Sequence, residues 1–210
     1  MRQVKGLGLA SLLLCVVVVC GCADGEVGNP RYDTVQREVN VDGHSLVVIP
    51  FRNAGGPFFQ SVDGYELTER VIYQMRTHLP KTRFISSLPI RKDHSPDAIE
   101  KMTPAQLGEA VDADLVLVGT LKEFSTREPL TTGIMRGTCE IDLKLYDVKT
   151  SQETWRRSLT IHYPTRGPGI PSTDTTTDKV REGLLTTSAD GIAKKFYTYK
   201  QRVGPAPLDW

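Results

Sequence analysis

The sequence lacks the cysteine arrangement that a disulfide framework requires. It has four cysteines, and three of them, Cys15, Cys20 and Cys22, fall within eight positions near its start. Cys20 and Cys22 are only two residues apart, and the single distant cysteine is Cys139, so no regular set of bridges can be built. We expect Cys139 to be a small buried residue of a strand, with an intermolecular bridge as the alternative.

An excess of charge of one sign is also missing. The chain has 26 basic and 25 acidic residues, which gives a formal net charge of +1. Without residues 1–21, which include Arg2 and Lys5, 24 basic and 25 acidic residues remain. A near-neutral domain has no overall electrostatic reason to bind nucleic acid or an anionic membrane. We therefore expect no nucleic-acid partner.

The common motifs of catalysis and metal binding are absent. There is no nucleophile elbow and no glycine-rich phosphate loop with its lysine. The histidines are far apart and have no His or Cys partner at the usual ligand spacings: His44, His78, His94 and His162. Asp112 and Asp114 have no paired acid or base, and we expect them to solvate the start of a strand. The sequence predicts no enzyme, no metal and no cofactor.

The apolar run from Leu7 to Val19 is too short to span a bilayer, because a membrane helix has about 20 apolar residues. Arg2 and Lys5 precede this run, and small residues follow it. A basic start, an apolar centre and a small-residue end are the layout of a cleaved export signal.

The end of this segment, Val19, Cys20, Gly21 and Cys22, resembles the lipobox of bacterial lipoproteins. The resemblance implies cleavage between Gly21 and Cys22, a diacylglycerol thioether on Cys22 and acylation of the new amine. Two or three acyl chains hold a protein stably on a membrane. Cys20 is the poorer candidate because bulky Val19 precedes it. An ordinary secretory signal and an uncleaved anchor are the alternatives.

The residues after Cys22 bear on the membrane that would hold the protein. Ala23 stands where many enterobacterial lipoproteins of the inner membrane have aspartate. The lipoprotein resemblance therefore favours the periplasmic face of the outer membrane. Asp24 leaves the inner membrane open as the alternative.

Hydrophobic periodicity predicts one α/β domain at residues 45–199. Residues 1–21 are the expected signal, 22–44 a lipidated tether and 200–210 a tail. We expect a polar loop between about residues 87 and 102, strands at 45–51, 82–86, 114–124, 138–148 and 154–163, and helices at 62–79, 103–111 and 175–199. The order β-α-β-α-β-β-β-α predicts a single mixed sheet with helices packed on it. Gly183 and Gly191 lie inside the last helix and indicate close packing or a bend.

Four residues are candidates for contact with a partner. Arg156 and Arg157 lie on an expected edge strand, one on each face, where they could meet an anionic partner or guard against aggregation. Phe58 and Phe59 end the loop NAGGPFF, which is either a plain turn or part of a small-ligand site. Trp155 fits either the core or an interface.

Three segments, LVVIPFRN, ADLVLVGTLKEF and IDLKLYDVKTSQETW, together resemble a group of periplasmic α/β lipoproteins. The group is related to the curli secretion protein CsgG and the penicillin-binding-protein activator LpoB, and more loosely to the N-terminal domain of TolB. Ser151 departs from the glycine often found in the hairpin turn of this group. The connection at 125–137 has 13 residues, too few for the two membrane strands of a CsgG-type channel.

The resemblance implies a non-enzymatic protein that binds other envelope proteins, often in an assembly that includes copies of itself. The predicted function is therefore binding or assembly in the bacterial envelope, at a membrane reached through the lipid on Cys22. The alternative is a periplasmic domain that binds a small ligand or glycan, or a degenerate enzyme. Its site would lie at the 53–60 and 125–137 loops.

Overall fold

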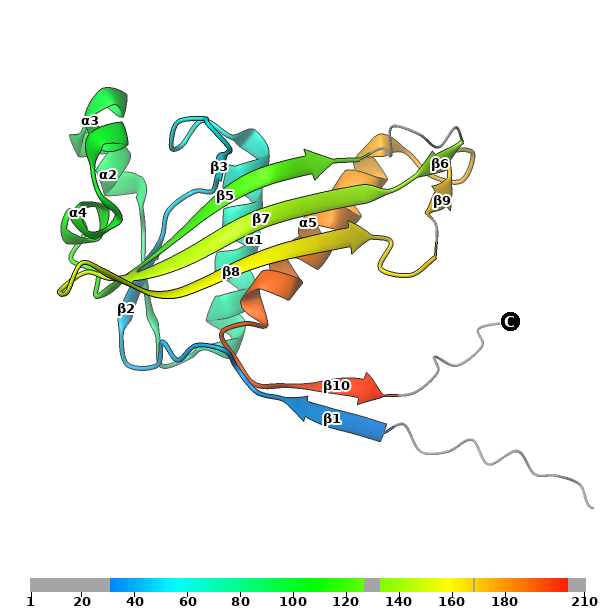
Figure 1. The fold of residues 1–210 in the computed structure, drawn as a ribbon, viewed down its shortest axis with the longest axis horizontal. Coiled ribbons are helices and arrows are strands. Elements are labelled where there is room, and N and C mark those ends of the chain that lie inside the picture. Colours follow the sequence, from blue (N-terminus) through cyan, green and yellow to red (C-terminus); the bar gives the residue numbers. More distant parts are fainter. Residues whose placement is uncertain (1–30, 127–132, 168, 204–210) are drawn as a thin grey trace, which may run out of the picture.

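The computed structural model describes residues 31–126, 133–167 and 169–203. Its main sheet has the strand order β4-β2-β5-β7-β8, with β3 beside β5 (Figure 1). Its strands are β2 (Ser45–Val48), β3 (Arg52–Asn53), β4 (Arg83–Ile85), β5 (Leu115–Ser125), β7 (Gly137–Asp147) and β8 (Gln152–Tyr163). β2 runs parallel to β4 and β5, whereas β5, β7 and β8 are antiparallel. The predicted α/β fold with a mixed sheet is confirmed.

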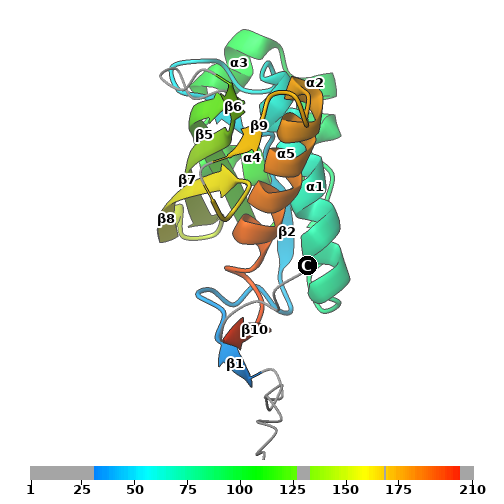
Figure 2. The same cartoon turned by 90° about the vertical axis from the view of Figure 1, so that its right-hand side faces the viewer.

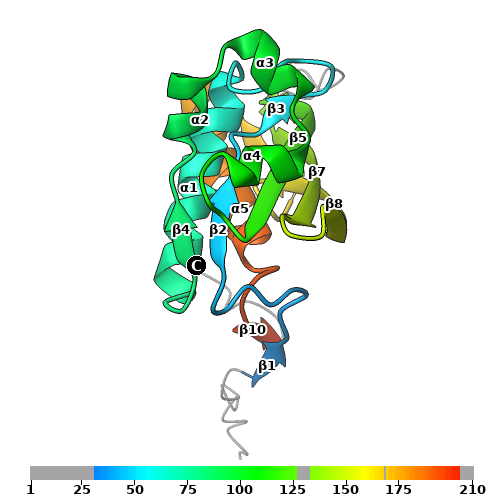
Figure 3. The ribbon, with the colours of Figure 1, turned by 90° about the vertical axis from the view of Figure 1, so that its left-hand side faces the viewer.

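Helices lie on both faces of this sheet but cover them unequally. Five helices occur among the described residues: α1 (Val62–His78), α2 (Leu88–Asp93), α3 (Pro96–Lys101), α4 (Pro104–Glu109) and α5 (Thr177–Ala193). α1 and α5 pack side by side on one face (Figures 2 and 3). α4 packs on the other face against β5. There Leu107 of α4 forms a second core cluster together with Val47 and Val116.

The strand SLVV of β2 is buried at all four positions because helices cover it on both sides. Leu46 and Val48 belong to the core under α1 and α5, whereas Val47 belongs to the core under α4. A continuous apolar run is the expected pattern for such a strand. The predicted strand is confirmed, but it ends at Val48 and not at residue 51.

The first helix follows its predicted course. Ser61 caps α1 by accepting a hydrogen bond from the amide of Gly64 at 3.0 Å. Leu67, Val71 and Met75 are buried along one stripe, and α1 ends at His78, just before Pro80. The side chain of Phe51 is fully buried. The backbone amide of Phe51 donates a hydrogen bond to the Thr68 hydroxyl of α1 at 3.0 Å. This contact fixes the chain between β2 and α1.

The last helix is shorter than predicted. α5 covers Thr177–Ala193, whereas the sequence suggested 175–199. The chain leaves the helix after Ala193, and strand β10 begins at Tyr199. Phe196 lies in the turn between them and still packs in the core. The residues that recur at helical spacing in this segment are all buried, as predicted: Val180, Leu184, Ser188, Ile192 and Phe196.

The segment expected as a polar loop contains α2 and α3. Pro89 lies in the first turn of α2 and Pro96 begins α3. Proline suits the first turn of a helix because its fixed φ is helical and its missing N–H has no intrahelical partner there. The Ser95 hydroxyl also caps α3 by accepting from the amide of Ala98. The prediction of a polar loop at about residues 87–102 is therefore wrong, because both prolines occupy the first turn of a helix.

The β7–β8 hairpin matches its prediction in detail. Cys139, Ile141, Leu143 and Leu145 are buried, and the residues between them are half-buried on the other face. In the turn, Asp147 accepts hydrogen bonds from the amide and hydroxyl of Thr150. Ser151 has a φ of 59°, a left-handed conformation that glycine adopts without cost.

Two short antiparallel pairs lie outside the main sheet. β6 (Ile134–Met135) pairs with β9 (Ile170–Pro171). β1 (Arg31–Val35) pairs with β10 (Tyr199–Val203) to form what we call the terminal ribbon. We expected a tether at 22–44 and a tail at 200–210, and the sequence gives no indication that they pair. In Figures 1 to 3 the ribbon is at the bottom of the molecule and α3 is at the top.

Candidate interaction surface

The face of β5, β7 and β8 that points away from α1 and α5 is uncovered over much of its length. In Figure 1 these strands lie in front of the two long helices. Their register places alternate polar residues of β7 and β8 side by side, including Lys144 with Arg156 and Asp142 with Ser158. We call this surface the open face. β8 has only β7 as a neighbour in the main sheet, so one of its edges has no ladder partner among the described strands.

Two carboxylates organise the charges of the open face. Asp142 lies 2.8 Å from Lys122 and accepts a hydrogen bond from Ser158 at 2.6 Å. The hydrogen bond from Lys122 has the largest effect on the pKa of Asp142 and lowers it, and the hydrogen bond from Ser158 lowers it further. Glu153 lies 2.7 Å from Arg156 and 3.7 Å from Lys144. Basic and acidic side chains thus alternate across this part of the open face.

A cavity of about 380 Å³ lies at one end of the open face. Its floor includes Thr120, Lys144 and Tyr146, and its walls come from the loop after β3 and from the segment joining α3 to α4. At the wall the Arg52 guanidinium lies 4.4 Å from the centre of the Phe58 ring.

The charged groups of this cavity already have partners. Arg52 lies 3.8 Å from Glu100, and the amide of Phe58 donates a hydrogen bond to the same carboxylate. Lys144 lies 3.7 Å from Glu153. An incoming charged ligand would therefore have to compete with these existing contacts.

The structure brings together two of the four predicted contact residues. Phe58 lines the cavity of the open face, and Arg156 lies on the same face of β8. Arg157 points to the other side of the sheet, where it lies 3.6 Å from Glu38. Phe59 has a φ of 63° and lines a different hollow beside α1, 5.9 Å from the Arg91 guanidinium.

Other predicted features have separate outcomes. Gly21 and Cys22 lie outside the described residues, as does part of the 125–137 loop. Trp155 is half-buried and packs edge-on against Phe196 at 5.4 Å, so it belongs to the core. Burial raises the pKa of the Cys139 thiol to about 11, which fits the expected buried apolar role.

Sequence reasoning missed several residues of the open face. Lys144, Tyr146 and Asp142 reach one surface with Glu153 because of the pairing between β7 and β8. The alternation along β7 indicated which residues share its outer face, but not which residues of β8 lie opposite. The bulge near Leu145 and Tyr146 shifts that register by one residue.

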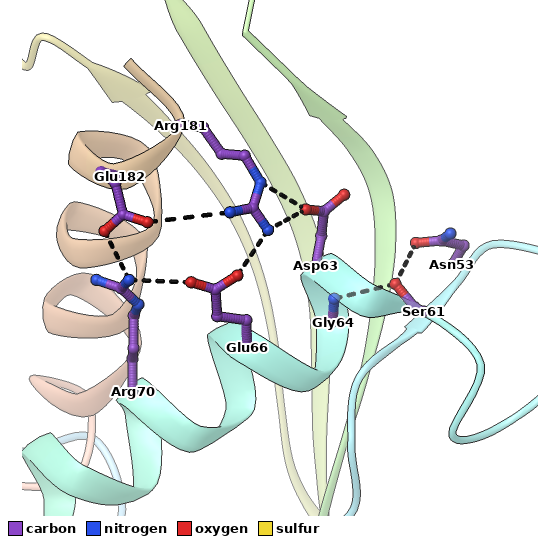
Figure 4. Close-up of polar contacts among 8 residues, drawn as sticks. All are labelled: Asn53, Ser61, Asp63, Gly64, Glu66, Arg70, Arg181 and Glu182. Atoms are coloured by element: carbon purple, nitrogen blue, oxygen red, sulfur yellow. Dashed lines mark hydrogen bonds and ion pairs between the residues drawn. The ribbon is translucent and has the colours of Figure 1, made fainter. Parts of the chain in front are cut away.

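A second charged group joins α1 to α5 and is a structural bridge (Figure 4). Arg181 of α5 lies 2.7 Å from both Asp63 and Glu66 of α1. Arg70 of α1 lies 3.0 Å from Glu66 and 2.7 Å from Glu182. The hydrogen bond from Arg181 lowers the pKa of Glu66. These ionised carboxylates fix the two helices on which the sheet packs.

The described residues offer neither a metal site nor a membrane-spanning helix. Within the three described ranges, no group of three or more His, Cys, Asp or Glu side chains is arranged to hold a metal ion. No helix in this part of the chain is long and apolar enough to cross a membrane. The described carboxyl groups with clearly shifted pKa values all have them lowered, as expected of ion-pair and hydrogen-bond acceptors.

The fold and the open face together define an α/β domain with one uncovered sheet surface. No protein-family model matches the sequence, and no curated protein matches it. Among solved structures, the chain is similar to lipoprotein GNA1162 from Neisseria meningitidis, with 16% identity, a TM-score of 0.46, and coverage of 71% of this chain and 97% of that one.

Two other solved structures are similar at the same level. The PelC dodecamer from Paraburkholderia phytofirmans has 14% identity, a TM-score of 0.44, and coverage of 80% of this chain and 99% of that one. The C-terminal domain of LpoB from Escherichia coli has 16% identity, a TM-score of 0.38, and coverage of 58% and 84%. Because identities and TM-scores are this low, function has to be inferred from the residues of this chain.

Proposed function

We propose that this protein is a lipid-anchored component of the bacterial envelope that binds another envelope protein through its open face and catalyses no reaction. The observation that supports this most is the alternation of basic and acidic side chains on an uncovered sheet face that includes the edge strand β8. Such patterns give an interface its specificity and orient its partner. An edge strand adds the option of main-chain pairing with an extended segment of the partner.

The lipid on Cys22 places this surface where partners are concentrated. Confinement to a membrane raises the local concentration of a partner on the same membrane, so a modest interface suffices. We assign the periplasmic side of the outer membrane because Ala23, and not aspartate, follows Cys22. Cys22→Ala should release the protein from membranes. Equal retention of this variant would show that another segment anchors the chain.

Adjacent arginines on opposite faces provide a matched test of the open face. A photo-crosslinking amino acid at Thr160, which is exposed on the open face, should capture a defined partner in intact cells. The same probe at exposed Lys179 on α5 should not capture it. Arg156→Gln should strongly reduce the yield of the crosslinked product from Thr160, whereas Arg157→Gln should leave this yield unchanged.

The contrary outcomes are clear. No product from Thr160, or equal losses in the Arg156 and Arg157 variants, would argue against the open face as the binding surface. Membrane fractionation of the same cells separates this result from a failure of the anchor.

The cavity supports a second candidate function, binding of a periplasmic glycan. Phe58 and Tyr146 supply aromatic surface there, beside polar groups suited to sugar hydroxyls. Glycan fragments should then raise the Tm of the wild-type protein, and Phe58→Ala should remove the increase. Phe59→Ala is the matched control because Phe59 lines the other hollow. No increase in the Tm of the wild-type protein, or an equal increase in Phe58→Ala, would exclude this site.

A further inference from the structure

The terminal ribbon brings the expected lipid attachment point close to the folded domain. Arg31, the first residue of β1, follows Cys22 by nine residues and pairs with Val203 at the end of β10. Nine residues span at most about 30 Å even when fully extended. If Cys22 carries acyl chains in the membrane, the ribbon cannot leave the neighbourhood of the lipid headgroups.

The end of the ribbon next to the domain is held against it. Val35 and Tyr199 are a cross-strand pair, and both are half-buried. The Tyr199 ring packs edge-on against Tyr197 at 6.2 Å, and Tyr197 stacks on His78 of α1 at 4.1 Å. The base of the ribbon is therefore held by aromatic contacts, and its orientation relative to the domain is set.

One face of the ribbon is exposed along its length and basic. The register pairs Tyr32 with Arg202 and Thr34 with Lys200, so these four side chains share one surface, which we call the outer face of the ribbon. All four are exposed, and Tyr32 has 55% of its surface accessible. The outer face combines two cations with an aromatic ring that has a polar tip, a composition suited to a membrane surface.

The cations of the ribbon contrast with those nearby. Lys195 and Arg157 both lie within ion-pair distance of Glu38, at 2.9 and 3.6 Å. No described carboxylate lies within 4.0 Å of the charged atoms of Lys200 or Arg202. β1 and β10 together carry three cations and one aspartate, a net charge of +2. The overall charge balance of the chain therefore hides a local basic surface.

We propose that the outer face of the ribbon binds an anionic phospholipid surface and so holds the domain in one orientation on its membrane. This inference rests on the lipid attachment in the proposed function, because the acyl chains keep the ribbon within reach. Each Lys or Arg near an anionic surface increases binding about fivefold, so Lys200 and Arg202 together contribute about 25-fold. Salt weakens this attraction by screening.

The test uses the complete lipidated protein in vesicles of phosphatidylcholine, alone or mixed with phosphatidylglycerol. A fluorophore at Thr34→Cys reports contact of the outer face with headgroups through quenching by headgroup-labelled lipids. Asp97→Cys in α3, at the far end of the molecule, is the distant control. Cys139 is buried, so the added cysteine is the accessible thiol.

Quenching at position 34 should be strong with phosphatidylglycerol and weak without it, and position 97 should remain unquenched. Lys200→Glu with Arg202→Glu should abolish the quenching. The milder Lys200→Gln with Arg202→Gln should lower the affinity of the outer face for the anionic surface about 25-fold and weaken the quenching accordingly. Lys92→Glu with Lys101→Glu, two exposed lysines of α2 and α3, is the matched control and should have no effect.

Different failures have different meanings. Protein that floats with both vesicle types but is quenched equally in each, or is still quenched in both ribbon double variants, overturns the ribbon proposal alone. Protein that floats with neither vesicle type refutes the lipid anchor, and the ribbon proposal with it. Circular dichroism of each variant confirms that the fold is retained.

Discussion

Two glycines in the long helices should respond to the same substitution with opposite signs. Gly64 is in the first turn of α1, and Gly191 is near the end of α5. Replacement of a helical glycine by alanine removes backbone freedom from the unfolded chain, which stabilises a helix by up to about 1 kcal/mol. The surroundings of the new methyl group decide whether this gain survives.

At Gly64 there is no room for a methyl group. A Cβ there would lie 1.9 Å from the carbonyl oxygen of Phe51 and 2.9 Å from the hydroxyl of Ser61. The closest atom belongs to the backbone, so the segment after β2 would have to move by about 1 Å or more. Overpacking of this kind costs about 1–3 kcal/mol. We expect Gly64→Ala to destabilise the protein by about 2 kcal/mol.

At Gly191 the methyl group would fit tightly, but only against the end of a side chain. Its nearest neighbour would be the Cδ1 atom of Ile161 at 3.3 Å, the flexible end of a side chain that can turn slightly. We expect Gly191→Ala to stabilise the protein by about 0.5 kcal/mol. The two variants should therefore differ by about 2.5 kcal/mol in free energy of unfolding.

Urea unfolding of the two variants and the wild type, followed by tryptophan fluorescence and far-UV circular dichroism, measures this difference. In thermal unfolding it corresponds to roughly 5–10 °C between the two Tm values, since 1 kcal/mol shifts the Tm of a domain this size by about 2–4 °C. Equal effects of the two substitutions, or a stable Gly64→Ala protein, would refute the assignment of close backbone packing at the start of α1.

Three further predictions concern named side chains. The Cys139 thiol, with its pKa raised to about 11 by burial, should not react with a disulfide reagent at pH 8 until the protein unfolds; rapid reaction of native protein would contradict its burial. Hydrogen bonds from Ser45 lower the pKa of Asp114, so its stabilising effect is present above the ordinary aspartate pKa and is lost as the pH falls through the lowered value. Urea unfolding at several pH values should show Asp114→Asn less stable than wild type at pH 7 and equal to it in strong acid; a constant difference would contradict this. Arg181→Lys should cost about 1 kcal/mol, measured by urea unfolding, because lysine cannot donate to both carboxylates of α1 in the same geometry; a loss that does not shrink in high salt would point to packing instead.

Much of the fold follows from local sequence pattern. The run SLVVIPF and the alternation from Cys139 to Leu145 each have a single good burial solution, and both are confirmed. Gly183 was expected to mark close packing or a bend, and a Cβ there would lie 2.2 Å from the Tyr163 ring. These features depend on residues that are close in sequence or on one face of one element.

The features that were missed depend on distant parts of the chain. The ribbon pairs residues about 170 positions apart, and its mostly exposed strands have no apolar alternation to reveal them. The open face needs the β7–β8 register, including its bulge, before Lys144 and Arg156 can be placed together. Phe58 and Phe59 are adjacent in sequence, yet the positive φ of Phe59 turns them toward different hollows.

The pairing of Arg31 with Val203 has a practical consequence for anyone who attaches a reporter to this protein. A cargo fused directly after Val203 would start beside the strand that leads back toward Cys22. If Cys22 carries the proposed lipid, a bulky fluorescent domain placed there would compete for the same space as the bilayer. Exposed positions on α3, at the opposite end of the molecule from the ribbon, are better sites for microscopy or pull-down tags, because cargo there leaves the ribbon undisturbed.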